Sequence, residues 1–361
     1  MMYRPLLIGI RQTIRNYLGC LRARPPKNMR VSVVVPVRDE EDSIRELLDG
    51  LLDQTRPPDE IIITDGGSVD STTQIIQAYI DKGAPVSLIR AGAALPGRGR
   101  NLGAAQSRCE WLAFTDAGIR PAKNWLEALV GRVEHDETID MVYGSWVPVT
   151  DTFFTECAAI AYVPPPTLRS GILSRPRSIA STLLRREVWQ SVEGFPEQLR
   201  SGEDLVFMDR VDGAGFRFVH EPLAQVQWSI RPTLVSTFNR FLVYSRNNIR
   251  AGLWRQWQAT ILSRYLFLLI MLIAVLLIEP RWFFIPIVCW LGMLAARAVV
   301  SIRRNQSCYP ASFARNVGRT LLIMAVLAVV DAAAIIGSIQ WLLLDWVRWS
   351  RKATVEAGNG A

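Results

Sequence analysis

Residues 31–40 read VSVVVPVRDE, a run of β-branched residues that is broken at Pro36 and followed by two acids. Two later runs have the same pattern of an apolar run followed by an acid: IIIT is followed by Asp65, and WLAFT is followed by Asp116. Short apolar runs separated by helical patterns predict an α/β fold, with a mostly parallel sheet that helices cover on both faces. Since such sheets bind ligands beyond the carboxyl ends of their strands, we expect these acids to share one active-site cleft.

The apolar residues of this 361-residue chain are concentrated toward its C-terminus. Up to about residue 255 the composition is that of a soluble α/β domain. Beyond it, the stretches 259–278, 282–302 and 320–344 each approach the roughly 20 apolar residues that a bilayer span needs. Buried core helices are the alternative, but three such stretches in close succession favour integration into a membrane.

These changes in composition predict five parts. The N-terminus is not a cleavable signal peptide, because arginines interrupt any apolar core, and it reads instead as an amphipathic helix for anionic lipid headgroups or for packing on the domain. The segment before the first apolar stretch is basic and aromatic, and suits either guidance of a lipid-linked acceptor or simple anchoring. In chain order we expect a basic amphipathic helix at 1–28, a catalytic domain at 29–230, an interfacial segment at 231–258, two or three transmembrane helices at 259–347 and a polar tail at 348–361.

The orientation in the membrane follows from the basic residues. The loop after the second apolar stretch carries Arg303, Arg304, Arg315 and Arg319. This loop is therefore expected in the cytoplasm, and with it the catalytic domain, at the cell inner (plasma) membrane. A third full span would export Arg348, Arg351 and Lys352 against the same rule, so either the third stretch re-enters or folds back at Gly337-Ser338, or the rule is broken. Asp331, inside this stretch, is expected to face protein or water.

Charge and cysteine content restrict the partners. The net charge of +8 suits acidic lipids and phosphorylated substrates. Nucleic acid is not an expected partner, since no basic patch is interleaved with aromatic residues as in a strand-binding groove. The 5 cysteines are odd in number and lack CxxC spacing, which argues against a disulfide framework and a zinc site and favours a reduced compartment.

Five motifs in a fixed order carry a resemblance to a known family. They are Val31–Glu41, Ile61–Thr72, Arg100-Asn101, Phe114–Gly118 and Gly194–Arg210. At these spacings they resemble glycosyltransferase family 2, of the GT-A fold, over about residues 29–228. The resemblance implies an enzyme that takes a sugar from a nucleotide-sugar donor and inverts the anomeric centre.

The same resemblance implies a nucleoside pocket at the ends of the first two strands. The residues that would line it are Pro36, Val37, Asp39, Glu40, Asp65 and Gly67. A proline leaves neighbouring backbone groups free to meet a base, and carboxylates accept hydrogen bonds from a base or a ribose. The alternative is that these acids only cap turns and helix starts. Where the family often has a second acid after Asp65, this chain has Gly66.

The diphosphate is expected near a glycine-rich basic loop at 96–101, ahead of a helix. Its donor-binding residues would be Arg98, Arg100 and Asn101, because arginine suits phosphate oxygens and glycine permits close approach. A solvated loop is the alternative. By resemblance, Asp116 and Ala117 belong to an acidic motif in which Asp116 holds Mg²⁺ or Mn²⁺ against the diphosphate. Gly118 replaces the family's second acid, and Asp116 as a turn cap is the alternative.

The acceptor side is expected at Glu203-Asp204. By resemblance, Asp204 is the catalytic base that deprotonates the attacking hydroxyl, and Glu203 positions it or the acceptor. The alternative is a helix N-terminus with two acids that suit its dipole. Gln225-Val226-Gln227-Trp228 lacks the arginine spacing of processive synthases, which favours transfer of a single sugar.

The sequence therefore predicts an inverting glycosyltransferase with a lipid, lipid-linked or glycan acceptor at the membrane, in envelope or polysaccharide synthesis. One alternative is transfer to a polyprenyl phosphate. Another is a catalytically inactive GT-A module that acts as a membrane scaffold, a hypothesis that the altered motif at Gly118 keeps open.

Overall fold

The computed structural model describes residues 29–165, 167–169, 172–174 and 176–345. The predicted N-terminal helix at 1–28 and polar tail at 348–361 lie outside the described residues. Within them, the main sheet has eight strands in the order β3-β2-β1-β4-β9-β6-β10-β5.

One half of this sheet is parallel and comes from the first third of the chain. Its strands are β1 (Val31–Val37), β2 (Glu60–Asp65), β3 (Val86–Arg90) and β4 (Trp111–Phe114). Strand β1 pairs with both β2 and β4, and the register sets Val37 beside Asp65 and Val34 beside Phe114. The residues that follow these three strands therefore meet at one edge of the sheet, as the sequence predicts.

The other half is mixed. Its strands are β5 (Ile119–Pro121), β6 (Met141–Val149), β9 (Thr182–Arg185) and β10 (Phe218–Ser229). Strand β9 is antiparallel to β4 and β6, β10 is parallel to β6, and β5 closes the edge antiparallel to β10. A two-stranded sheet of β7 (Thr167–Arg169) and β8 (Ile172–Ser174) and the 3₁₀ turn η1 (Ile179–Ser181) lie between α6 (Phe153–Tyr162) and β9.

Helices cover both faces of the sheet. They are α2 (Ile44–Leu52), α3 (Thr72–Asp81), α4 (Pro96–Gln106), α5 (Trp125–His135), α7 (Arg186–Ser191) and α8 (Glu203–Gly213). Alternate residues of β1 divide between two cores: Val33 and Val35 pack with α2 and α5, whereas Val34 packs with α4, α7 and α8. Because a strand buried on both faces must be apolar throughout, the run at 31–37 has no alternation. The predicted α/β fold with both faces covered is confirmed.

The predicted glycine-rich loop at 96–101 is a helix instead, and that prediction is wrong. Helix α4 begins at Pro96, where a fixed backbone angle and a missing N–H suit the first helical position. A Cβ at Gly103 would lie 2.4 Å from Val34 Cγ1, and one at Gly99 would lie 2.9 Å from Thr64 Oγ1. The glycines therefore let α4 approach the sheet, and this packing outweighs their low helix propensity.

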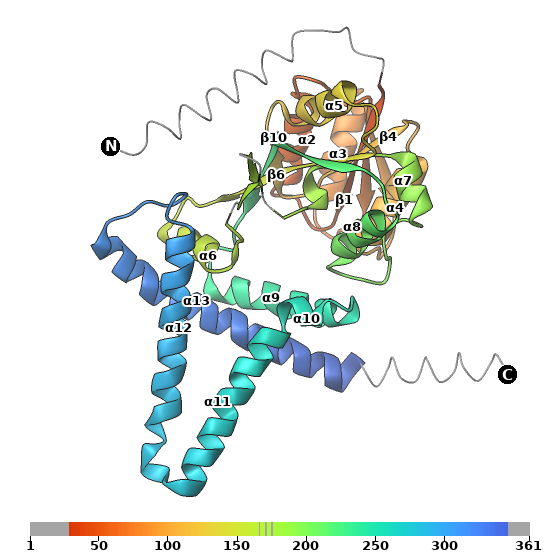
Figure 1. The fold of residues 1–361 in the computed structure, drawn as a ribbon. Coiled ribbons are helices and arrows are strands. Elements are labelled where there is room, and N and C mark those ends of the chain that lie inside the picture. Colours follow the sequence, from red (N-terminus) through yellow and green to blue (C-terminus); the bar gives the residue numbers. More distant parts are fainter. Residues whose placement is uncertain (1–28, 166, 170–171, 175, 346–361) are drawn as a thin grey trace, which may run out of the picture.

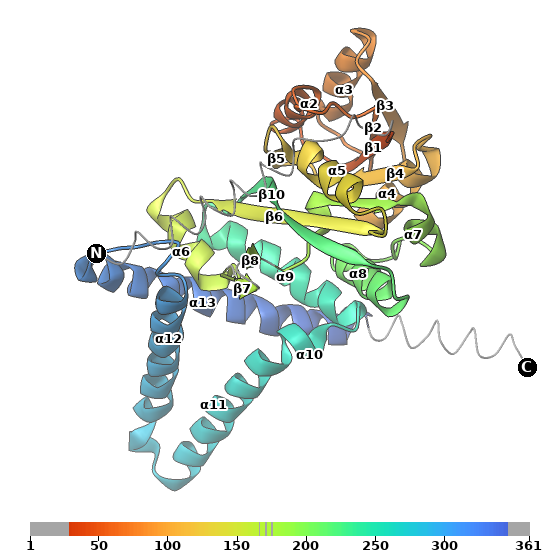
Figure 2. The same cartoon turned by 45° about the horizontal axis from the view of Figure 1, so that its top comes forward.

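The C-terminal part is helical. Its elements are α9 (Leu234–Arg250), α10 (Trp254–Trp257), α11 (Ala259–Ile278), η2 (Pro280–Trp282), α12 (Phe284–Arg304), α13 (Phe313–Gln340) and the π-helical turn η3 (Trp341–Asp345). Within the described ranges, three helices are long and apolar enough to cross a membrane: 259–278, 280–304 and 313–344. Figures 1 and 2 show α11 and α12 projecting away from the sheet domain, while α13 runs alongside α9 and across the upper ends of that pair.

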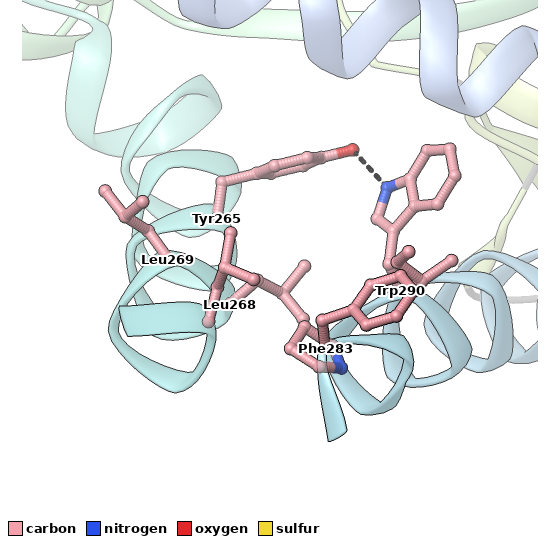
Figure 3. A pocket seen from close by; sticks show the side chains of 8 residues that line it. Tyr265, Leu268, Leu269, Phe283 and Trp290 are labelled. Carbon is pink, nitrogen blue, oxygen red and sulfur yellow. Dashed lines mark hydrogen bonds between the residues drawn. The ribbon is translucent and has the colours of Figure 1, made fainter. Parts of the chain in front are cut away.

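Helices α11 and α12 diverge from their connecting turn and flank an open pocket of about 400 Å³ (Figure 3). Its lining is apolar except at one end, where Trp290 Nε1 donates a hydrogen bond to Tyr265 Oη at 3.1 Å. Tyr265 in turn donates to Asp331 of α13 at 3.1 Å. The open side of the hairpin is thus tied to α13 by polar groups.

Candidate active site

Two loops beyond the carboxyl ends of β1 and β2 are bonded to each other. The backbone N–H of Asp39 donates to Ser68 Oγ at 2.9 Å, and Val69 N–H donates to Asp39 Oδ1 at 2.8 Å. The N–H of Glu40 donates to Thr72 Oγ1 at 2.8 Å. Asp39 has a left-handed backbone with φ 54°, so these bonds fix an unusual conformation. The loops form one preformed edge over the sheet.

Asp65 is 5% exposed and shapes the second of these loops. Its carboxylate accepts hydrogen bonds from the N–H of Ser68 at 3.0 Å and of Gly67 at 3.3 Å. Gly67 has φ 87°, a conformation that favours glycine. The capping role that the sequence left open for this acid is therefore present. Contact with a nucleoside stays a prediction, as it does for Pro36 and Val37 at the end of β1.

Arg100 lies at the centre of the site. It is 3% exposed on α4, and its two terminal nitrogens donate to carboxylates from distant parts of the chain. Nη2 donates to Asp116 Oδ1, just beyond β4, and Nη1 donates to Glu203 Oε1 at 2.7 Å, at the start of α8. Burial by itself would lower the pKa of Arg100, but the charges of Asp116 and Glu203 outweigh it and raise the pKa. The guanidinium that the sequence assigned to the diphosphate is thus held by protein carboxylates.

Asp204 follows Glu203 at the N-terminus of α8, after Gly202 with φ 80°. Burial and the neighbouring charge of Glu203 raise its pKa to about 6, although Arg100 opposes the shift. The charge of Asp116 adds to the rise, so the acids of β4 and α8 share one electrostatic environment. A half-buried carboxyl with a pKa near 6 is suited to act as a general base close to neutral pH.

The neighbours of Arg100 on α4 have different surroundings. Asn101 uses both ends of its amide, because Oδ1 accepts from the Phe195 N–H at 2.9 Å and Nδ2 donates to the Phe195 carbonyl at 2.9 Å. It also accepts from Trp189 Nε1 at 3.0 Å. Asn101 therefore holds the segment that leads to α8. Arg98, on the opposite side of the helix, is exposed.

Several buried polar atoms around this network accept or donate no hydrogen bond within the described residues. They are Thr64 Oγ1, Thr115 Oγ1, Arg100 Nε, Ser201 Oγ and Glu203 Oε2. Buried polar groups are normally paired, so a cluster of unpaired ones indicates a place where a ligand or water completes the bonding. The two threonines were missed by sequence reasoning, because a threonine inside a β-branched run reads as an ordinary strand residue.

Residues that match a known family sit at this site. The sequence model described as Glycosyl transferase family 2 matches residues 32–181. Residues 32–181 of the chain are therefore similar to glycosyltransferase family 2. The match runs from β1 to η1, which ends just before β9, and so includes the loops at Asp39 and Asp65, α4 with Arg100, and Asp116.

Curated glycosyltransferases are similar to this chain over about half of its length. Glycosyltransferase AglE of Haloferax volcanii is 30% identical over 53% of this chain and 64% of its own. Pre-mycofactocin glycosyltransferase of Mycobacterium tuberculosis is 27% identical over 58% and 44%. The poly(ribitol-phosphate) beta-N-acetylglucosaminyltransferase TarS of Staphylococcus aureus is 31% identical over 50% and 32%. The chain thus spans about one third to two thirds of these relatives' lengths.

Among solved structures, TarS residues 1–349 of Staphylococcus aureus in complex with UDP align with a TM-score of 0.45 and 19% identity, covering 87% of this chain and 91% of that chain.

The acidic motif that resembles that of family 2 can be tested for a cation. Asp116 has a side chain that is 34% exposed, and its Oδ1 accepts a hydrogen bond from Arg100. Within the described residues, no group of three or more His, Cys, Asp or Glu side chains is arranged to hold a metal. A cation bound here would have Asp116 as its protein ligand, with phosphate oxygens and water completing the shell, which is an arrangement that Mg²⁺ accepts.

Glu40 lies close to the position of the missing second acid. A Cβ at Gly118 would be 3.5 Å from Glu40 Oε2, and Gly118 itself has φ 74°. The same Oε2 accepts a hydrogen bond from Ser43 Oγ. The fold therefore brings a carboxylate from the β1 loop beside Gly118, which no sequence spacing indicates.

Helix α9 and Arg231, just before it, place further groups near these acids. Burial and the like charge of Arg240 lower the pKa of Arg231, while Tyr244 and Glu40 oppose the shift. Burial raises the pKa of Tyr244, to which the charge of Asp204 contributes. The Arg240 guanidinium lies 4.8 Å from the centre of the Tyr244 ring. The basic and aromatic segment predicted before the first apolar stretch thus borders the acidic site.

Proposed function

We propose that the chain is an inverting glycosyltransferase that moves one sugar from a nucleotide-sugar donor to a lipid or lipid-linked acceptor at the membrane. The observation that supports this most is the placement of Asp204 beside the pair of carboxylates that Arg100 bridges, with a pKa raised to about 6. The similarity to glycosyltransferase family 2 supports a nucleotide-sugar donor. The three long apolar helices support a location at the membrane.

In the proposed reaction, Asp204 accepts the proton of the acceptor hydroxyl as that oxygen attacks the anomeric carbon. Glu203 shares its environment and, through Arg100, ties the base to the motif at Asp116. A divalent cation at Asp116 would neutralise charge on the leaving diphosphate. Asp39, Glu40 and Asp65 would present oxygen acceptors to the nucleoside from the ends of β1 and β2, where the two loops are bonded to each other.

Localisation is part of the same proposal. The basic residues from Arg303 to Arg319 support, by the positive-inside rule, a catalytic domain on the cytoplasmic side of the inner membrane. Envelope or polysaccharide synthesis fits an enzyme whose α9 brings Tyr244 near Asp204 and also packs against the apolar helix α13. Transfer to a polyprenyl phosphate is the second candidate, since Arg231 and Arg240 would suit a phosphate at that border.

The test uses protein purified in detergent and incubated with UDP-, GDP- and dTDP-sugars, with and without Mn²⁺, and with membrane lipid extract as acceptor. Release of nucleoside diphosphate from one donor is expected, and Asp204→Asn should abolish it. Asp209→Asn is the matched control, because Asp209 is exposed on the same helix. Full turnover by Asp204→Asn would refute the assignment of the base, and silence with every donor would favour the scaffold hypothesis.

A further inference from the structure

Helix α13 is pinned to the catalytic-domain side at two distant points. Near its start, Arg319 Nε donates to Glu156 Oε1 at 2.7 Å and Arg315 Nη2 donates to Glu156 Oε2 at 2.8 Å. Glu156 lies on α6, four residues into the helix that follows β6. Near its end, a Cβ at Gly337 would lie 2.9 Å from the Leu242 carbonyl of α9, so the backbones are in direct contact. The two anchoring helices both continue from strands of the main sheet.

The polarity of α9 shows at what depth this contact lies. Within its 17 residues α9 carries Asn239, Arg240, Arg246, Asn247, Asn248 and Arg250. A helix with so many arginines and amides is not stable in hydrocarbon, where charged side chains are costly and polar groups need partners. Helix α13 lies along α9 in both views of the fold (Figures 1 and 2). It therefore lies at the same depth relative to the hydrocarbon of the membrane as α9.

The α11–α12 hairpin has one apolar segment, which extends from its turn to the level of Tyr265 and Trp290. Its turn carries an ion pair between Arg281 and Glu279 at 2.7 Å. Above the turn the pocket lining is apolar, up to Tyr265 and Trp290 (Figure 3). There the polar groups resume, because Arg297 Nη2 donates to Asp331 Oδ1 of α13 at 3.0 Å. Asp331 of α13 therefore lies at the border of the apolar layer rather than in its middle.

One face of α13 nevertheless fits lipid. We define the α13 stripe as its exposed and half-exposed positions Val317, Leu321, Ala325, Ala328, Ala332, Ile336 and Ile339, of which Ala328 is half-exposed and also packs against the apolar cluster that α13 forms with α6 and α12. These follow one another at spacings of three and four residues, and none is charged. The opposite face of the helix is buried, including Asp331 at 0% exposed. An apolar stripe on a helix held beside polar elements is typical of a helix that lies in the membrane interface.

We propose that α13, although long enough to span, lies in the plane of the membrane surface on the same side as the catalytic domain, with its stripe in the lipid. The α11–α12 hairpin is then the crossing element of the described residues. This arrangement keeps Arg303, Arg304, Arg315 and Arg319 on one side together with the basic residues that follow α13 in the sequence. It removes the conflict with the positive-inside rule without a break at Gly337-Ser338, and it does not depend on the chemistry of the site.

The first test measures sidedness in the full chain. A membrane-impermeant maleimide is applied to intact and permeabilised cells, and peptide mass spectrometry reads each cysteine separately. The reporters are native Cys308 between α12 and α13, Arg281→Cys in the hairpin turn and Ala361→Cys at the chain end. We expect the cysteine at 361 to be labelled under the same condition as Cys308, and the cysteine at 281 under the opposite one. Labelling of 361 together with 281, or of 281 together with Cys308, overturns the proposal.

The second test measures depth and does not depend on the chain end. Spin labels at Val317, Ala328 and Ile339 in lipid nanodiscs report depth by collision with oxygen and a polar relaxant. An in-plane helix gives three equal, shallow depths. An upright helix places Ala328 about 16 Å deeper than the two ends, at 1.5 Å per residue. A label at Leu269, exposed on α11, is the deep reference, and an Ala328 label as deep as Leu269 overturns the proposal.

Discussion

The raised pKa of Asp204 predicts the pH dependence of sugar transfer. In the proposed reaction Asp204 acts as the base only when it is deprotonated, and burial together with the charge of Glu203 moves its pKa from an ordinary 3.8 to about 6. We therefore expect kcat/KM to be half-maximal near pH 6 and to fall about tenfold for each pH unit below it. An unshifted carboxyl would keep the rate constant down to about pH 5.

The assay follows initial rates of nucleoside diphosphate release from pH 4.5 to 8, using the donor found in the panel. Thermal unfolding at each pH separates loss of the base from loss of the fold. Two variants sharpen the result. Glu203→Gln removes the charge that raises the pKa of Asp204 and should move the midpoint to lower pH, since a glutamine oxygen still accepts from Arg100. Asp209→Asn should leave the midpoint unchanged.

A rate that stays constant to pH 5 would refute the reasoning, because it would mean that the base has an ordinary pKa. A midpoint near 6 that Glu203→Gln does not move would refute the contribution of Glu203, and would leave burial and the charge of Asp116 as the sources of the raised pKa.

The remaining predictions concern stability. At pH 7.5, Asp204→Asn should be more stable than the wild type by at most about 3 kcal/mol. The reason is that a carboxyl with a raised pKa in the folded state makes the wild type lose stability as the pH rises through 6, whereas asparagine does not titrate. The difference in free energy of unfolding should vanish below about pH 4. Arg100→Met should lower the free energy of unfolding by about 3–5 kcal/mol by leaving two carboxylates unpaired, whereas Arg98→Met, at an exposed position of the same helix, should change it by less than about 0.5; equal effects in denaturant titrations would contradict the bridging role. Gly103→Ala should cost about 1–3 kcal/mol because its Cβ meets Val34 at 2.4 Å, and Gly50→Ala, with nothing within 4 Å, should be neutral or stabilising; melting temperatures that move in the same direction would argue against the close packing of α4.

Local patterns were sufficient for the parallel half of the sheet. An unbroken β-branched run such as 31–37 is stable only as a strand buried on both faces, so it predicts the central strand and the acids at its end. The apolar helices after residue 258 were equally predictable from the sequence, because length and composition determine which segments can cross a bilayer. In both cases the information lies in neighbouring residues.

Helix α4 shows where such patterns fail. Its PGRGRN start has the composition of a loop, and only contact with the sheet makes the glycines favourable there. For the same reason the partners of Arg100 were not predictable. Asp116 and Glu203 lie 16 and 103 positions away in the chain, and only the folding of β4 and α8 around α4 brings their charges to one guanidinium.

The sequence by itself determined the family 2 motifs, the acids at the strand ends and the presence of long apolar helices, since each depends on residue type and local order. Only the tertiary structure decided that Arg100 pairs with carboxylates, that Glu40 lies beside Gly118 and that α13 lies along α9. The physical reason is that charge pairing and helix direction depend on which surfaces meet in space. An apolar helix of sufficient length has the same sequence signature whether it crosses a bilayer or lies along its surface.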